Sequence, residues 1–503
     1  MSAEVAKKNR RMNAAPLSEV VAPARHSEAI RGSVADGTRN PAPFVSSEPA
    51  AQVSPRTVAH VESWTRTTLG TLAGGRGKTI SPAKTPHQKF ELYSVPSFPR
   101  GQPEIVTGDV VGSSKQLVEP RTLLLSKINP RINRAWVVGN FTTHQKIAST
   151  EWITFPPSQE VVPEFLCYFL QQNEVRDFLA RNASGVGGSL MRVKPATLRD
   201  FPFAYPPLEH QREIVAEIEK QFTRLDAGVA TLRRMQANLK RYRAAVLKAA
   251  CEGRLVPTEA ELAKAEGRTY ETGEQLLARI LADRRKNWNG RGKYKEPAAP
   301  DTTNLLPPPE GWTWTNIGQL AEVGTGATPA KGNSEFYADG TIPWVTSGAV
   351  NSPRIECADQ FVTTTALEKC NLTLYPPGTL LLAMYGEGKT RGMASELMFS
   401  ATTNQALAAI EVPEKLLNFV KVVLWKNYDD VRKSASGGVQ PNLNLSLVRA
   451  IHIALPPLAE QTRIVCEVER RLSVIEELQT AVTNNVKRAA GLRQSILRRA
   501  FYD

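Results

Sequence analysis

Membrane-spanning segments, disulfide pairs and metal-ligand clusters are missing from this sequence of 503 residues. No apolar run approaches the roughly 18 residues that a membrane helix needs, and the N-terminus lacks the apolar core of a signal peptide. The five cysteines are odd in number and scattered, so we interpret them as reduced thiols. The six histidines are isolated, which argues against a metal site. We therefore expect a cytoplasmic protein that makes no membrane contact.

Motifs for nucleotide, methyl-transfer and nuclease chemistry are incomplete. A Walker A loop needs a glycine five positions before its Gly-Lys-Thr, but Leu72 and Ala383 stand at those positions. An amino-methyltransferase site needs an aromatic residue after Pro-Pro, and none follows a Pro-Pro pair here. The Glu387-Gly388-Lys389 triplet has the form of a nuclease Glu-x-Lys, but no Pro-Asp lies close upstream. The sequence therefore predicts a non-catalytic protein without a cofactor of its own.

Positive charge is in excess, with a net charge of +14 at pH 7. This excess favours a polyanionic partner, although charge alone does not separate nucleic acid from a membrane surface. Residues 1–58 are rich in Ala, Ser, Pro and Arg and show no apolar period, so we expect a disordered tail. A chain of this length exceeds a single hydrophobic core and suggests three or four folding units.

One long stretch occurs twice. Residues 205–253 align without a gap with residues 455–503, each residue matching the one 250 positions later. Each copy follows a Pro-Pro pair, has no internal proline and repeats apolar residues every seventh position, which predicts a coiled-coil helix. Such a helix of roughly 45 residues would be about 65 Å long, so we expect it to act as a spacer. The expected seam consists of Ile218, Leu225, Leu232, Leu239, Val246, Val468, Ile475, Val482, Ala489 and Ile496.

The segment before each helix is also repeated, in a looser register. Residues 63–73 match 312–321, and the Thr-Leu-Leu-Leu run at 122–125 matches 379–382. Short β-branched and aromatic runs separated by Gly, Pro and Asn predict strands. The sequence thus predicts a tandem duplication of a mixed α/β (α+β) domain followed by a long helix. The expected units are a tail (1–58), a domain (59–205), a helix (206–253), a spacer (254–310), a second domain (311–455) and a second helix (456–503). Within the spacer we expect a short helix at 271–288 and then a proline-rich linker without a packing pattern.

The loops after the two Thr-Leu-Leu-Leu runs are rich in side chains that suit DNA. Lys and Arg neutralise phosphates, and Arg, Asn and Gln can pair with base edges. Solvated loops of a basic protein are the alternative. The candidate DNA-binding residues are Lys127, Asn129, Arg131, Asn133 and Arg134 in the first domain, and Tyr385, Lys389, Arg391, Asn404 and Gln405 in the second. Lys115 and Lys194 are weaker candidates. Cations also crowd the end of each long helix, where they suit DNA or an acidic partner protein.

These motifs together resemble one known family. The helix starts at 206–215 and 456–465 share the pattern PPLxxQxxIV, the second domain opens with WTWTNIGQLAEVGTG, and GEGKTRG is followed by TTNQALAAI. Over residues 63–503 the chain resembles the specificity subunit of a type I restriction-modification system. The N-terminal tail lies outside this resemblance and is longer than this family usually has.

The resemblance implies a fold, partners and a role. In that family two target-recognition domains lie at opposite ends of two antiparallel helices, and each domain reads one half of a bipartite site in double-stranded DNA. The specificity subunit is not catalytic. It assembles with two methyltransferase subunits that use S-adenosylmethionine, and with restriction subunits that use ATP and Mg. Because the two candidate loops differ strongly, we expect two different half-sites.

Other functions remain open at this point. A subunit of a methylation-only system, or an orphan subunit, fits the same sequence. A coiled-coil scaffold with two globular heads also fits, and it predicts no sequence-selective DNA binding. An enzyme fused to its own specificity domains would need a metal or cofactor pocket that the motif searches did not find.

Overall fold

The computed structural model describes residues 64–74, 77–185, 191–288, 292–385, 390–434 and 443–502, without the side chains of 429–434. The expected tail at 1–58 and the candidate Lys389 lie outside these residues. Residues 58–503 form one compact unit. Within the described ranges, no helix combines the length and the apolar character needed to cross a bilayer.

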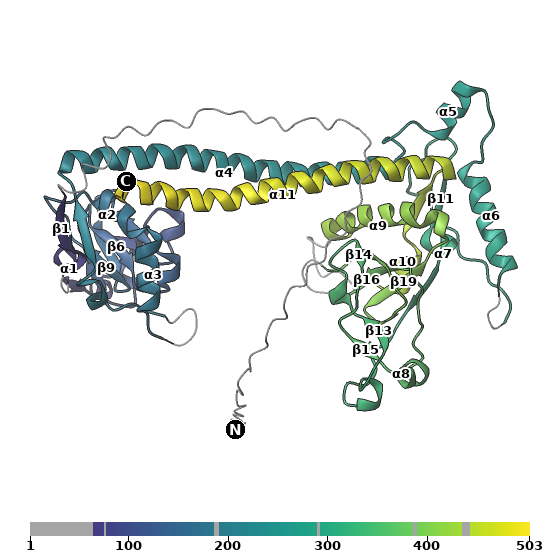
Figure 1. Cartoon of the computed structure of the whole chain (residues 1–503), viewed down its shortest axis with the longest axis horizontal. Coiled ribbons are helices and arrows are strands. Elements are labelled where there is room, and N and C mark those ends of the chain that lie inside the picture. The colour runs from purple at the N-terminus through teal and green to yellow at the C-terminus, as the bar shows by residue number, and fades with distance from the viewer. Residues whose placement is uncertain are drawn as a thin grey trace, which may run out of the picture. The chain divides into compact units, whose positions relative to one another are not determined.

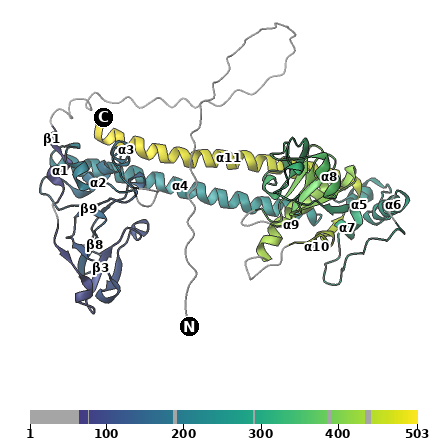
Figure 2. The same cartoon turned by 90° about the horizontal axis from the view of Figure 1, so that it is seen from below.

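Two long helices, α4 (Leu208–Cys251) and α11 (Leu458–Tyr502), dominate the fold. Both begin directly after Pro-Pro, because proline has no N–H to donate and its φ suits a helix start. Figure 1 and Figure 2 show the two helices side by side. Contacts between them include Asp226 with Arg493, Gln236 with Thr483, and Arg243 with Glu476. Each step along α4 is matched by an equal step backwards along α11, so the helices are antiparallel.

The seven-residue apolar repeat lies on the packed face of both helices. Five of the seam residues are buried: Ile218, Val246, Val468, Ile475 and Val482. The other five are partly buried: Leu225, Leu232, Leu239, Ala489 and Ile496. Leu478, an apolar residue of α11 outside the expected seam, is 44% exposed. A heptad repeat places its apolar residues on the face where two helices pack together, as is seen here.

The first domain combines β-sheets with three short helices. Its first strand, β1 (Thr65–Thr68), pairs antiparallel with its last strand, β10 (Pro202–Tyr205). Between them lie a five-stranded sheet of β2 (Thr79–Ile80), β5 (Lys115–Leu117), β8 (Gln145–Ser149), β3 (Lys89–Tyr93) and β4 (Glu104–Thr107), and a three-stranded sheet of β7 (Ala135–Val137), β6 (Leu123–Ser126) and β9 (Trp152–Phe155). The helices are α1 (Leu69–Leu72), α2 (Pro163–Leu170) and α3 (Asn173–Arg181).

The second domain repeats this plan with different details. β11 (Thr313–Asn316) pairs with β20 (His452–Leu455). One sheet contains β12 (Glu322–Thr325), β19 (Leu407–Glu411), β16 (Leu380–Ala383), β17 (Ala394–Leu397) and β14 (Arg354–Ile355), and another contains β15 (Phe361–Val362), β13 (Ile342–Val345) and β18 (Thr402–Thr403). The helices are α7 (Ile317–Leu320), α8 (Thr364–Lys369), α9 (Glu414–Ser434) and α10 (Leu445–Arg449). The predicted mixed α/β class with long paired helices is confirmed.

Each domain shares its core with both long helices. The first core includes Ile218 from the start of α4 and Phe501 from the end of α11. The ring centroids of Phe501 and Phe165 are 4.9 Å apart. The second core includes Val246 from the end of α4 and Val468 from the start of α11. Each repeat therefore completes its core with the end of the other repeat's helix.

The spacer packs against the second domain. Its helices are α5 (Glu259–Glu266) and α6 (Gly273–Lys286), so the predicted short helix at 271–288 is present and α5 was not foreseen. Both helices begin at a threonine capping box. In the proline-rich part, the Leu306 carbonyl accepts from Trp314 Nε1 at 2.9 Å, and the Ala298 carbonyl accepts from Asn316 Nδ2 at 3.0 Å. The proline-rich stretch thus contacts the second domain, although its sequence shows no packing pattern.

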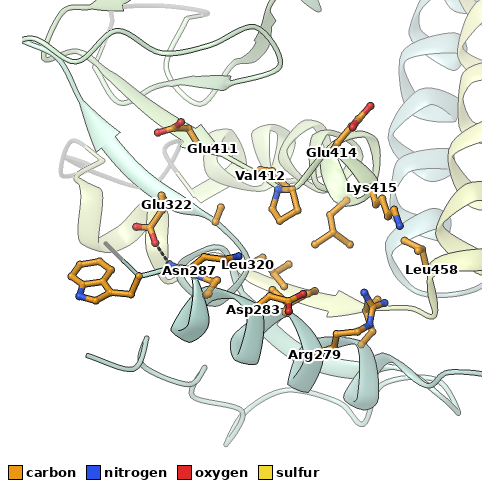
Figure 3. Close-up of a pocket in the computed structure, with 17 residues that line it drawn as sticks. Arg279, Asp283, Asn287, Leu320, Glu322, Glu411, Val412, Glu414, Lys415 and Leu458 are labelled. Atoms are coloured by element: carbon orange, nitrogen blue, oxygen red, sulfur yellow. Dashed lines mark hydrogen bonds and ion pairs between the residues drawn. The ribbon is translucent and has the colours of Figure 1, made fainter. Parts of the chain in front are cut away.

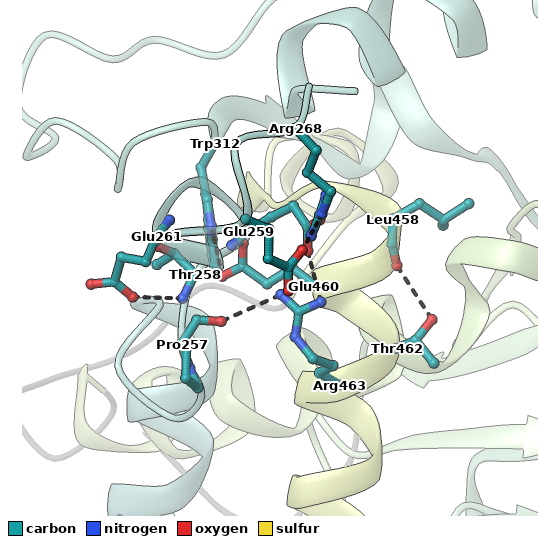
Figure 4. A network of polar contacts seen from close by, with 11 residues as sticks. Pro257, Thr258, Glu259, Glu261, Arg268, Trp312, Leu458, Glu460, Thr462 and Arg463 are labelled. Carbon is teal, nitrogen blue, oxygen red and sulfur yellow. Dashed lines mark hydrogen bonds and ion pairs between the residues drawn. The ribbon is translucent and has the colours of Figure 1, made fainter. Parts of the chain in front are cut away.

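A buried polar network fastens α5 to the start of α11 (Figure 4). The Glu460 carboxylate accepts from the Glu259 backbone N–H at 2.8 Å and from Trp312 Nε1 at 3.0 Å. Burial raises the pKa of Glu460 despite these two hydrogen bonds. Burial opposes ionisation of Glu259 too, but hydrogen bonds from Arg463 and Arg268 outweigh it and lower the pKa of that carboxyl. The network joins the spacer, the entry to the second domain and the second long helix.

Candidate nucleic-acid interface

The candidate loop of the first domain follows β6 and folds back on its own backbone. Lys127 donates from Nζ to the Thr150 carbonyl at 2.6 Å, and its backbone N–H donates to Glu151 at 2.9 Å. Burial lowers the pKa of Lys127, although the charge of Glu151 works in the opposite direction. Arg134 Nη1 approaches the Ile128 carbonyl at 3.4 Å. The side chains of Lys127 and Arg134 thus help to shape this loop.

The two asparagines of this loop occupy the left-handed backbone region. Asn129 has φ 45° and Asn133 has φ 48°, a conformation that Asn tolerates better than most residues. Asn133 also donates from Nδ2 to the Leu170 carbonyl at the end of α2, at 2.6 Å. The sequence predicted that these two residues contact DNA. Their left-handed backbone conformation is by itself a sufficient reason for asparagine at both positions. Their contact with DNA stays a prediction.

Arg131 is the candidate of this loop that is most open to a ligand. It is exposed, and no described residue forms a hydrogen bond or ion pair with its guanidinium. The backbone N–H of Val193 donates to the Lys127 carbonyl at 3.0 Å, which brings the exposed Lys194 to the same region. Lys115 lies opposite Ser149 in the β5–β8 ladder, beside the Thr150 turn that holds Lys127. These backbone contacts bring together segments that are far apart in the sequence and that carry Lys115, Lys127 and Lys194.

In the second domain the candidates meet where β16 ends and β19 begins. The exposed Tyr385 follows Met384, whose backbone N–H donates to the Ala406 carbonyl at 2.8 Å. Asn404 accepts from the Ala406 N–H at 3.1 Å, so its side chain shapes the turn. Gln405 is exposed, and its Oε1 accepts from the Thr328 hydroxyl at 2.6 Å.

Two features at this site lie outside the sequence-based list. Thr328 follows the GTG of the domain opening, and only its contact with Gln405 reveals a role. The hydroxyls of Thr402 and Thr403 are buried and have no hydrogen-bond partner among the described residues. Arg391, which the sequence analysis did name, is half-buried, and its Nε has no partner among the described residues either. The strand edge therefore carries polar groups that its described surroundings do not satisfy.

The two candidate loops occupy equivalent places in the two repeats. In the first, the N–H of Lys127 bonds the carbonyl of Glu151, and in the second the N–H of Met384 bonds the carbonyl of Ala406. Both loops leave the central strand of a ladder, β6 or β16, at the same end. The side chains they present differ, with Arg131 in one and Tyr385 and Gln405 in the other. Equivalent positions with different side chains suit the recognition of two different sequences.

The helix-end cations are partly engaged between the helices. Arg493 Nη1 lies 2.9 Å from Asp226, and its guanidinium lies 4.0 Å from the Phe222 ring centroid. Arg243 lies 3.5 Å from Glu476. In the described ranges, no three His, Cys, Asp or Glu side chains are placed to hold a metal. The exposed side chains of this surface include the cation Arg131, the amide Gln405 and the aromatic ring of Tyr385.

Comparison with known proteins gives a consistent result. Residues 309–488 match the family described as the type I restriction modification DNA specificity domain. The EcoR124I/EcoR124II specificity subunit of Escherichia coli is 24% identical over 185 residues, which cover 36% of this chain and 45% of that protein. The EcoDI specificity subunit of Escherichia coli is 23% identical over 381 residues, which cover 72% and 73%.

A solved structure shares the fold. It comes from work on the complex assembly and conformational transition of the type I R-M system, and it matches with a TM-score of 0.62 at 18% identity, covering 87% of this chain and 97% of that chain. The chain spans about half the length of several curated relatives that it matches, such as the EcoR124 subunit.

Proposed function

Because this chain belongs to the family of type I restriction-modification specificity subunits, we propose that it reads a bipartite DNA target, with each mixed domain contacting one half-site. The observation that carries this proposal is the pair of candidate loops at equivalent strand ends of the two repeats. Because the long helices are antiparallel, an approximate two-fold axis relates the two repeats. This arrangement suits a DNA target whose two half-sites are related by the same axis. The net charge of +14 favours association with DNA phosphates.

The long helices set the separation of the half-sites. A helix of 44 residues, as in α4, is about 66 Å long. Because each domain core contains side chains from both helices, a change of helix length would shift a whole domain. We therefore assign the spacing of the two half-sites to α4 and α11.

In this proposal the partner subunits catalyse the reactions. The chain supplies sequence recognition, and two methyltransferase subunits that use S-adenosylmethionine dock along the long helices and methylate adenine. Restriction subunits that use ATP and Mg complete the assembly where the system restricts DNA. A methylation-only or orphan subunit differs from this in its partners and not in its own surface. The scaffold alternative gives no role to the polar strand edge around Gln405.

Expression of the chain with and without its cognate methyltransferase subunit tests the proposal. Sequencing of the DNA for methylated adenines should reveal one bipartite motif that appears only when both proteins are present. Methylation by this chain alone would overturn the non-catalytic assignment. Sequence-independent methylation with both proteins present would overturn the recognition role and favour a scaffold.

A further inference from the structure

A groove of about 750 Å³ lies between the spacer helix α6 and the junction of β19 with α9 (Figure 3). Its floor is apolar, and its lining includes Ile280, Leu320, Val412, Leu416 and Leu458. A volume of this size is in the range of sites that hold several side chains or a drug-sized ligand. None of the candidate DNA-binding residues lines it. The groove is therefore a feature separate from the recognition loops.

The equivalent place in the first repeat is nearly closed. There the hollow is lined by Leu72, Pro163 and Leu166, which match Leu320, Pro413 and Leu416, and its volume is about 10 Å³. A hollow of this volume holds at most one water molecule. The second repeat differs because α6 stands beside the hollow and forms an outer wall. The groove thus occurs once among the described residues, whereas the recognition surfaces occur twice.

The rim of the groove is acidic. Asp283 stands on the α6 wall, and Glu411 and Glu414 stand on the opposite wall (Figure 3). No described cation forms an ion pair with any of these three carboxylates. Of the three cations that line the groove, Arg279 is paired with Glu271 and Arg284 with Glu322, which leaves Lys415. An acidic rim of this kind stands out in a chain with a net charge of +14.

The strand register adds to the local negative charge. Glu411 lies directly opposite Glu322 in the β12–β19 ladder, and like charges in directly opposite positions destabilise a sheet. Burial raises the pKa of Glu411, and the charge of Glu322 adds to this rise. Arg284 already pairs with Glu322, so a cation brought to the rim would chiefly offset the charge of Glu411. DNA phosphates would instead add negative charge.

We propose that this groove binds a basic amphipathic segment of a partner protein, one copy per chain. Aliphatic or aromatic side chains of the segment would occupy the apolar floor, and Lys or Arg side chains would meet Asp283, Glu411 and Glu414. Trp288, which lines the groove and is 43% exposed, supplies an aromatic surface for the segment. Aromatic residues of this kind often dominate the binding energy at protein interfaces. The proposal does not rest on the DNA-reading function.

A labelled helical peptide of leucine and lysine, with roughly four turns and one apolar face, provides the probe. We expect it to bind the full chain, and the double substitution Glu411→Lys and Glu414→Lys to weaken binding at least tenfold in fluorescence anisotropy. Trp288→Ala should weaken binding as well. Hydrogen exchange with the peptide bound should show protection at 276–288 and 411–416.

A matched control separates the groove from general charge. Glu119 and Glu368 are exposed and do not line the groove, so Glu119→Lys with Glu368→Lys adds the same charge and should leave affinity within about twofold. Because Glu411→Lys removes a like-charge pair, the groove variant should remain folded, which its thermal unfolding will report. Equal affinity for both double variants would overturn the proposal. So would equal binding of a leucine–glutamate peptide, or protection confined to other parts of the chain.

Discussion

Among the described residues, the side chain of Gln211 at the start of α4 makes three hydrogen bonds, whereas its counterpart Gln461 at the start of α11 makes one. Gln211 Oε1 accepts from the Val162 N–H at 2.7 Å, and its Nε2 donates to the carbonyls of Glu160 and Pro206, both at 2.8 Å. Gln461 keeps the bond to its proline, Pro456, at 2.9 Å. Its Oε1 is buried and has no partner among the described residues.

The difference shows how one duplicated unit is held in two ways. In the first repeat, the glutamine fastens the helix to the segment before α2. In the second, the neighbouring Glu460 takes over, binding Trp312 and the backbone of Glu259 in the spacer. The bond from glutamine to proline closes the helix start in both copies. The contacts from helix to domain differ, because those at the start of α11 involve the spacer.

The largest expected effect contrasts Phe501 with Cys251, its counterpart at the end of the other helix. Phe501→Ala should destabilise the first domain by about 3–5 kcal/mol, because it leaves a cavity against Phe165 and Phe169. Cys251→Ala should cost about 1 kcal/mol or less, because this smaller side chain is only partly buried. Hydrogen exchange of α2 and of α9 measures each domain separately. Equal losses in both domains would contradict the interlocked cores.

Replacing the glutamine at the start of each long helix should also destabilise the first repeat more than the second. Gln211→Ala should cost about 2–3 kcal/mol, because it leaves the buried N–H of Val162 unpaired. Gln461→Ala should cost about 1 kcal/mol, since one hydrogen bond is lost and the unpartnered Oε1 disappears with it. Chemical denaturation with local hydrogen-exchange readout compares the two variants. A larger loss for Gln461→Ala would show that its Oε1 has a partner.

Within the first recognition loop, Asn133 and Arg131 should separate folding from binding. Asn133→Ala should destabilise the loop by about 1–2 kcal/mol, because alanine disfavours φ 48° and the bond to Leu170 is lost. Arg131→Ala should change stability by less than about 0.5 kcal/mol. It should lower DNA affinity and reduce the slope of log affinity against log salt by about one. An unchanged slope would remove Arg131 from the phosphate contacts.

The smallest expected effect concerns the charge pair on the groove rim. The raised pKa of Glu411 means that the folded chain holds this proton more tightly than the unfolded chain. Stability is therefore lost as pH rises through the folded pKa, and it is retained below the unfolded value of 4.5. Glu411→Gln should stabilise by a few tenths of a kcal/mol at pH 7 and by nothing well below pH 4.5. A gain that persists in acid would point to a cause other than charge.

Much of the scaffold was predictable from sequence because its signals are local and repeated. The Pro-Pro starts fix where α4 and α11 begin, and the heptads fix which face is buried. The packing of the spacer was not predictable, since it depends on single long-range bonds such as Trp314 to Leu306. The continuous helix α9 was not predicted, and its matched segment in the first repeat is divided into α2 and α3.

The sequence predicted where the candidate site lies better than it predicted which residues form it. Both loops lie at equivalent strand ends, as the repeated Thr-Leu-Leu-Leu run suggests. Residue type did not separate Asn133, which supports the backbone, from Arg131, which is free to bind. Thr328 enters only through its contact with Gln405 across the fold, and no local pattern marks it. The contact of each of these residues with DNA stays a prediction.

One domain replacement tests the central claim most directly, namely that each repeat reads its own half-site. In a chain whose residues 311–455 are replaced by a second copy of 59–205, both recognition surfaces are the same. Co-expressed with the cognate methyltransferase subunit, this chain should direct adenine methylation to a palindromic motif made of the first half-site twice. A motif that keeps the original second half-site would contradict the account, because the second domain would then not be its reader.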